Sequence, residues 1–178
     1  KRCLRAPLYS FKGKTAGLNT IEQENGKKLS VAAIAVAAVA LIIIAVSQFY
    51  VKPLKAEAAN QTFTAEQYFR ASEYEKALNG DGNALGFAQI VDEYGSKAGA
   101  AVYLYAGVCE IQLGNADNAI SYLKKYNGKD EILAARAICC LGDAYAMKED
   151  YKSALSQYIK AADYSDNAYA AGYLLKAG

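Results

Sequence analysis

The chain has no histidine and no tryptophan among its 178 residues, and it has only two prolines and one methionine. The missing histidine removes the side chain that proteins use most often as a general base and as a metal ligand. A catalytic site would have to be built from carboxylates, lysine, tyrosine or cysteine. The sequence therefore predicts a protein that is not an enzyme, with no catalytic residue, no cofactor and no metal site.

One short stretch has the beginning of a calcium-binding loop. Asn79, Asp81 and Asn83 alternate as in such loops, but Ala84 stands where glycine is needed and Ile90 where the closing glutamate is needed. Glycine and Asx residues are also the ordinary residues of tight connections between helices. We therefore interpret this stretch as a connector.

Positive charge is scarce outside the N-terminal part of the chain. Residues 1–28 hold seven Lys or Arg and two Glu, a net charge of +5, whereas residues 52–178 hold thirteen Lys or Arg and sixteen Asp or Glu, a net charge of −3. A nucleic-acid-binding protein needs a basic patch or stripe, and the mildly acidic body offers none. We expect neither a nucleic-acid partner nor a small-molecule substrate.

Residues 29–51 form an uncharged run of 23 residues, LSVAAIAVAAVALIIIAVSQFYV. As a helix, this run would extend about 35 Å, enough to cross a bilayer core of about 30 Å. The alternatives are a buried core helix, which would need a far larger protein around it, and a cleaved signal peptide, whose apolar region is shorter. The sequence predicts a retained transmembrane helix.

The basic residues around this run predict its orientation. Seven Lys or Arg precede it, and Lys52, Lys55 and Arg70 are the basic residues in the twenty positions after it. Because basic residues favour the cytoplasmic side of a membrane, we expect a single-pass protein of the bacterial inner membrane. Its N-terminus would be cytoplasmic, and the large C-terminal part would be periplasmic.

Small residues recur with a period of 35 in the C-terminal part. Gly107 and Ala119 lie twelve positions apart, and so do Gly142 and Ala154. Small residues at a crossing let two antiparallel helices approach closely. One further step of 35 before Ala119 reaches Ala84, which predicts a degenerate first unit there.

Helix pairs with a period near 34 residues are typical of tetratricopeptide repeats, and the residues around the small positions resemble that family. The family has a large residue four positions before the first small one and another four positions after the second, with a later small position that Ala161 matches. The matching large residues are Tyr103, Ile138, Leu123 and Tyr158. The resemblance implies an all-α fold of antiparallel helix pairs stacked into a right-handed superhelix, with repeat packing at Gly107, Ala119, Gly142, Ala154 and Ala161.

These observations divide the chain into four parts. We expect a basic cytoplasmic tail, a transmembrane helix, a helical linker and a repeat domain, at residues 1–28, 29–51, 52–63 and 64–178. The repeat units are predicted at about 64–95, 96–130 and 131–166, with a partial unit at 167–178. Within this scheme, no helix breaker interrupts residues 55–78. Because the sequence does not start with methionine, we expect a fragment or a processed form. The partial last unit would either cap the array or continue in a longer native chain, and we favour continuation.

The four cysteines do not form a metal-binding pattern. Cys3 precedes the transmembrane run, and the other three, at positions 109, 139 and 140, fall within predicted helices at places where a small apolar residue fits. We expect these three to be buried free thiols.

In tetratricopeptide arrays, ligand peptides usually lie along the first helices of the units, so the resemblance implies a partner-binding concave face here. Leu104, Val108 and Asp143 replace the lysine and asparagine with which some arrays clamp acidic C-terminal peptides. The face would therefore suit an apolar partner segment, or helix 54–78 of the same chain. Its residues are Ala101, Leu104, Val108, Ile111, Arg136, Cys139, Asp143 and Ala146.

The layout of basic tail, single span and external repeats resembles the YfgM-like ancillary subunits of the bacterial Sec translocon and envelope proteins of this kind in the Bacteroidota. That resemblance implies a membrane-anchored scaffold that binds other proteins, linking translocon components with periplasmic chaperones. The alternative is a structural organiser of an outer-membrane or other envelope assembly complex.

Overall fold

The computed structural model describes residues 14–164 and 168–178, with side chains from Ser30 onward. All regular structure in these residues is helical, which confirms the all-α prediction. The chain divides into two compact units, Lys1–Tyr50 and Val51–Gly178. Most of the predicted basic tail, residues 1–13, lies outside the described residues.

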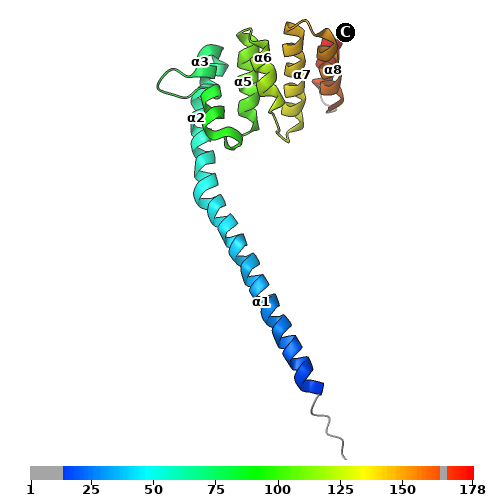
Figure 1. Ribbon diagram of the computed structural model, residues 1–178. Coiled ribbons are helices and arrows are strands. Elements are labelled where there is room, and N and C mark those ends of the chain that lie inside the picture. The colour runs from blue at the N-terminus through cyan, green and yellow to red at the C-terminus, as the bar shows by residue number, and fades with distance from the viewer. Residues whose placement is uncertain (1–13, 165–167) are drawn as a thin grey trace, which may run out of the picture. The chain divides into compact units, whose positions relative to one another are not determined.

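The first unit contains one long helix, α1 (Lys14–Val46), shown in blue to cyan in Figure 1. It begins well before the predicted start of the transmembrane segment at residue 29. From Ser30 onward its apolar side chains are exposed in every direction around the axis. Among the described residues, this is the one stretch of helix long and apolar enough to cross a membrane. The finding is compatible with a single-pass membrane protein.

A π-helical turn, Ser47–Val51, follows α1, and helix α2 (Lys52–Arg70) begins directly after it. Pro53 lies in the first turn of α2 and has no backbone N–H to give to the carbonyl of Phe49. A π turn is a common local response to an interrupted helical hydrogen-bond ladder. Residues 52–63, expected to be a linker, are the first part of α2, and Ala58 is fully buried there.

Helix α2 ends at a tight turn, so the expectation of one unbroken helix over residues 55–78 was wrong. Ser72 has φ 61°, in the left-handed region. Its N–H donates to the Phe69 carbonyl at 3.0 Å, and the Glu73 N–H donates to the Tyr68 carbonyl at 2.9 Å. This pair of bonds is a Schellman motif, which ends a helix without needing glycine or proline. Helix α3 (Tyr74–Asn79) then turns back along α2.

The same type of turn joins the two helices within each of the next two pairs. Helix α5 (Ala100–Gln112) pairs with α6 (Ala116–Lys124), and α7 (Glu131–Met147) pairs with α8 (Tyr151–Tyr164). The left-handed residues of these turns are Gly114, with φ 83°, and Glu149, with φ 61°. In each turn, the left-handed residue and the residue after it donate the two backbone hydrogen bonds of the Schellman motif. The helices α5 to α8 stand in a row (Figure 1).

The three turns give the pairs a common register. In each pair a small residue lies seven positions before the left-handed residue and another lies five positions after it; the small residues are Ala65 and Ala77, Gly107 and Ala119, and Gly142 and Ala154. The first pair therefore precedes the second by 42 positions, not 35, and the assignment of Ala84 to this role was wrong. Ala84 lies in a loop between α3 and the next helix.

The additional residues of the first pair form a loop at positions 80–86. Asp81 holds this loop: its Oδ1 accepts the N–H groups of Asn83 and Ala84 at 2.9 and 2.8 Å, and its Oδ2 accepts the Tyr68 hydroxyl at 2.7 Å. The hydrogen bond from Tyr68 and those two backbone bonds lower the pKa of Asp81 to about 2. The loop is an Asx-stabilised connector between two helices.

The helix after the loop, α4 (Phe87–Tyr94), packs against α2, α3 and α5 and is followed by a 3₁₀ turn, Gly95–Ala98. Phe87 is fully buried and stacks on Tyr105 with 5.2 Å between ring centroids, and Phe69 lies 5.1 Å from the Tyr105 ring. These rings join α2, α4 and α5 in one aromatic cluster, which makes up part of the largest core of the second unit.

The last described helix, α9 (Ala170–Ala177), packs against α8. Its Tyr173 and Ala177 contact the buried cluster of Cys139, Ala154, Tyr158 and Ala161. The opposite side of α9 is open, since Leu174 and Leu175 are 53% and 84% exposed. Residues 165–167 of the predicted third and fourth units lie outside the described residues.

Candidate functional site

The predicted small residues lie where the paired helices meet. A Cβ added to Gly107 would come 2.6 Å from the Leu123 Cγ, and one added to Gly142 would come 2.6 Å from Cε1 of Tyr158 and 3.2 Å from the Ala154 carbonyl oxygen. Ala119, Ala154 and Ala161 are buried at 2% exposure or less. Side chains of the second helix therefore fill the space that the glycines leave.

Three of the four predicted concave-face residues of α5 pack in a cluster with residues of α6 and α7. Leu104 is 3% exposed and belongs to a cluster with Ala119, Leu123, Ala137, Cys140 and Ala144, against which Val108 and Ile111 also pack. The prediction of Leu104 as a partner-binding surface residue was therefore wrong. Its side chain is used for packing between neighbouring pairs. Ala101, Val108 and Ile111 are partly exposed.

The predicted residues of α7 share one face of that helix. Arg136, Cys139 and Asp143 follow helical spacing and line a cavity of about 300 Å³ between α7 and α9. Arg136 is exposed and Asp143 is half-buried. Cys139 is only 4% exposed and forms the floor of the cavity, so the prediction that it is accessible to a partner was wrong. Ala146, half-buried, packs against the cluster that contains Cys139. We call this cavity the α7/α9 groove.

The remaining walls of the α7/α9 groove come from α9 and the residues just before it. They are Ala168, Tyr169, Gly172, Tyr173 and Lys176, together with Cys140 from α7. A Cβ added to Gly172 would meet nothing within 4 Å, so the missing side chain there leaves open space. The sequence showed no signal for these residues beyond their place in a partial fourth unit.

Asp143 ties three helices together at the groove. Its Oδ1 accepts a hydrogen bond from the Tyr158 hydroxyl of α8 at 2.9 Å. Its two carboxylate oxygens accept hydrogen bonds from Lys176 Nζ of α9 at 2.6 and 2.8 Å. Burial acts against the charge of Lys176, but the hydrogen bond and charge pairing with Asp143 outweigh it and raise the lysine's pKa. Burial and the bond to Asp143 also raise the pKa of Tyr158. Both groups therefore remain protonated donors at neutral pH.

The thiols of the groove are neutral. Burial, followed by the nearby charge of Asp143, raises the pKa of Cys139, and the same two causes raise the pKa of Cys140 to about 12. Burial likewise raises the pKa of Cys109 to about 12. All three are buried free cysteines, as expected from the sequence. Because the thiolate is the reactive form, the floor of the groove behaves as an apolar surface.

The groove therefore combines an apolar floor with a charged rim. Arg136 makes no ion pair or hydrogen bond with any residue that the structure describes, whereas Lys176 is paired with Asp143. Tyr169 and Tyr173 add aromatic walls. Such a surface can hold an apolar side chain and offer a cation to an acidic group beside it.

No metal centre is found in the part of the chain that the structure describes: His, Cys, Asp and Glu side chains do not gather there in groups of three or more that could hold an ion. Comparisons with protein-family models, with curated proteins and with solved structures found no match to this chain.

Proposed function

We propose that the chain is a membrane-anchored scaffold whose helical domain is a tetratricopeptide-type array that binds other proteins. The observation that carries the proposal is the common register of three helix pairs, each with a Schellman turn and small residues at the same two positions. An array built this way presents the first helices of its units along one surface. In this proposal the array is a right-handed superhelix, and it has no enzymatic activity.

The proposed binding surface is the α7/α9 groove. Three of the residues expected to face a partner, Arg136, Cys139 and Asp143, line it, and it is open to solvent at Arg136. The apolar floor favours an apolar segment of a protein partner. The guanidinium of Arg136, which has no partner among the described residues, favours a neighbouring carboxylate.

The proposed location is the bacterial inner membrane, with α1 as the single span. The apolar stretch of α1 supports the span, and the seven Lys or Arg among residues 1–28 support a cytoplasmic N-terminus. The partners would then be envelope proteins: translocon components and periplasmic chaperones in the first reading, and outer-membrane assembly factors in the alternative.

Thiol labelling tests the proposed orientation. Ser121 is exposed on α6, so Ser121→Cys provides a reactive position in the helical domain, whereas Cys3 reports on the N-terminal tail. In intact spheroplasts a membrane-impermeant maleimide should modify position 121 and spare Cys3. Modification of Cys3 alone would reverse the orientation.

Photo-crosslinking tests the proposed partner surface in cells. A photoreactive amino acid at Arg136 should capture specific envelope proteins, and the same amino acid at Lys152, exposed on α8 and outside the groove, is the matched control. Capture of translocon subunits or chaperones at 136 and not at 152 supports the first reading. Capture of outer-membrane assembly factors supports the alternative, and equal capture at both positions overturns the groove as the binding surface.

A further inference from the structure

A second cavity lies on the other face of α7. It has a volume of about 280 Å³, and its floor comes from α6 and α7: Leu123, Ala134, Ala137, Ile138 and Leu141. These α7 positions follow helical spacing and alternate with Arg136, Cys139 and Asp143 of the α7/α9 groove. The two cavities are therefore separated by the helix itself. We call this one the α6–α8 pocket.

The α6–α8 pocket exists because α6 is short. Helix α6 has nine residues and ends at Lys124, whereas its counterpart α8 has fourteen. The chain from Tyr126 to Asp130 is not helical, so no last turn of α6 covers the start of α7. Tyr126 instead folds over Gly128, whose missing Cβ leaves space for the ring.

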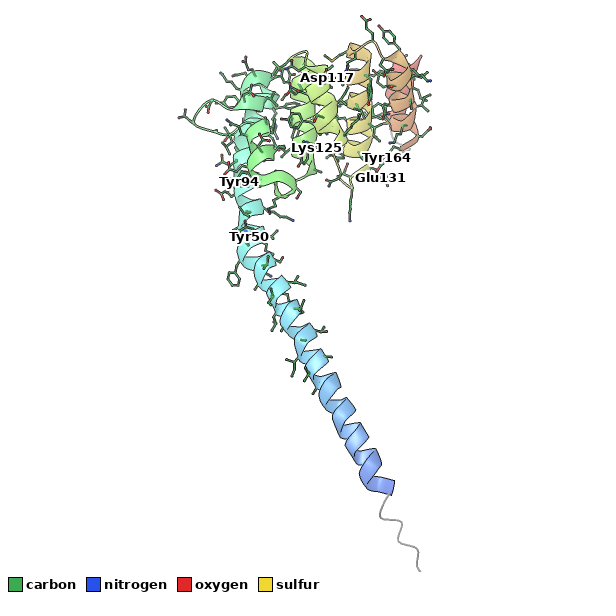
Figure 2. All side chains as sticks on the ribbon, viewed as in Figure 1. Tyr50, Tyr94, Asp117, Lys125, Glu131 and Tyr164 are labelled. Carbon is green, nitrogen blue, oxygen red and sulfur yellow. The ribbon has the colours of Figure 1, made fainter. Side chains whose placement is uncertain are left out.

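The rim of the pocket is polar, and Lys160 is the charged side chain among the described residues that line it. Tyr126 and Asn127 lie on one side, and Lys160 and Tyr164 of α8 lie on the other. Figure 2 labels Tyr164 at the end of the helical domain where α7 begins at Glu131. Burial, followed by the nearby charge of Asp130, raises the pKa of Tyr126, so its hydroxyl stays protonated as a donor.

Lys160 has no partner within the described part of the chain. It is exposed, and it makes no ion pair, hydrogen bond or ring contact with any residue described there. By contrast, Lys148 and Lys176 each pair with an aspartate. A lone ammonium beside an apolar floor is complementary to a ligand that joins an apolar group to a carboxylate.

The size of the pocket limits what can enter. A volume of about 280 Å³ lies just below the range for small-molecule sites, about 300–1,000 Å³. It accommodates one large side chain and is too small for a whole lipid tail. The tyrosine hydroxyls and Asn127 on the rim can pair with the polar backbone on either side of such a side chain.

We propose that the α6–α8 pocket binds a peptide segment in which a large apolar residue is followed or preceded by an acidic residue. The apolar side chain fills the pocket over Ile138 and Leu141, and the carboxylate pairs with Lys160. This site is independent of the α7/α9 groove and would give the array a second contact with a protein partner.

Fluorescence polarisation with labelled peptides on the full chain in detergent micelles tests the proposal. The probe is Ser-Gly-Glu-Phe-Gly-Ser, compared with the same peptide carrying Ala for Phe or Gln for Glu. Loss of the ring should weaken binding at least tenfold, and loss of the charge should weaken it about two- to fivefold, as for an exposed ion pair. Absence of binding by the probe at 1 mM, or equal binding of the three peptides, overturns the proposal.

Two matched pairs of variants assign the binding to the pocket. Lys160→Gln should abolish the difference between the Glu and Gln peptides, whereas Lys152→Gln, an exposed lysine on the same helix, should preserve it. Tyr164→Ala should weaken binding of the probe peptide at least threefold. Tyr151→Ala should leave that binding unchanged, because Tyr151 is exposed outside the pocket. Equal effects of the two members of either pair overturn the assignment. Displacement of the probe by an equal concentration of octanoate would identify a fatty-acid site instead and overturn the peptide assignment.

Discussion

The first helix pair and the two later pairs solve the same packing problem in different ways. In the later pairs a glycine of the first helix faces a large side chain of the second: Gly107 faces Leu123, and Gly142 faces Tyr158. Each large residue lies four positions after the second small residue. In the first pair the corresponding position is Asp81, in the loop and exposed, and the small residue of the first helix is Ala65.

The crossing therefore requires glycine only where a large side chain of the partner helix points at it. In the first pair no large side chain of α3 points at the crossing, because the corresponding residue, Asp81, lies in the loop. The methyl group of Ala65 therefore fits and is fully buried. The first pair compensates with α4, whose Phe87 joins the aromatic cluster. Four predictions test this contrast.

Disruption of the aromatic cluster in the first pair should reduce stability the most. Phe87→Ala removes a fully buried ring and should lower the free energy of unfolding by about 3–5 kcal/mol, through lost transfer energy and the cavity left behind. Urea unfolding followed by circular dichroism measures it. Phe63→Ala is the control, since Phe63 is 61% exposed, and a comparable loss there would show that the method does not report on packing.

The second prediction separates the two glycine crossings. Gly142→Ala would push the methyl group against the Tyr158 ring, which Asp143 holds, and near a backbone carbonyl. Overpacking of about 1–3 kcal/mol should outweigh the gain of about 1 kcal/mol from the helix propensity of alanine.

At Gly107 the obstacle is the Leu123 side chain alone, with its Cγ at 2.6 Å and its Cδ2 at 2.8 Å, so Gly107→Ala should destabilise the fold, but less than Gly142→Ala, where a backbone carbonyl also lies close. Gly172→Ala is the control, because the added methyl group meets nothing within 4 Å, and it should stabilise by about 0.5–1 kcal/mol. The ranking of the three variants in thermal unfolding is the measurement. A larger loss at position 107 than at 142 would contradict the contrast.

The third prediction concerns the turn that all three pairs share. Gly114 has φ 83°, and Gly114→Ala should cost about 1 kcal/mol because a Cβ is strained in the left-handed region. Glu149→Gly should relieve the corresponding strain and raise the melting temperature by a smaller amount, since glycine also loses more entropy on folding. If Glu149→Gly lowers the melting temperature, its side chain contributes more to the turn than the strain costs.

The smallest effect is a pH dependence confined to the loop of the first pair. The folded state lowers the pKa of Asp81 from 3.8 to about 2, so Asp81 stabilises the fold above pH 4, and that contribution is lost as pH falls from about 4 to about 2. The difference in melting temperature between the wild type and Asp81→Asn should shrink over this interval. Asp92→Asn, an exposed carboxylate of α4, is the control, and a constant difference for Asp81→Asn would contradict the assignment.

The later pairs were easier to predict from the sequence than the first. Gly107 and Gly142 repeat with a constant period, because both pairs have an unbroken second helix. In the first pair the seven-residue loop shifts the period, and a left-handed serine, Ser72, ends α2 where the sequence shows no breaker. The two backbone hydrogen bonds of the Schellman motif stabilise the serine in that conformation. A serine in the sequence does not by itself indicate such a turn.

The candidate sites were predicted only in part. The resemblance to tetratricopeptide arrays predicted Arg136, Cys139 and Asp143 on one helix face, and they do line one groove. The resemblance did not reveal that Leu104 would be covered by α7, because burial depends on which helix packs beside it. The α6–α8 pocket was not predicted, because it arises from the length difference between α6 and α8.

The helical class, the long apolar segment and the positions of the glycine crossings could all be predicted from the amino-acid sequence. Each depends on local properties: hydrophobicity, helix propensity and the size of single side chains. Three other features follow from the packing of the helices: where α2 ends, which faces are covered, and the pairing of Lys176 with Asp143 across 33 positions. These features depend on contacts between residues distant in the chain, whose energies no local pattern contains.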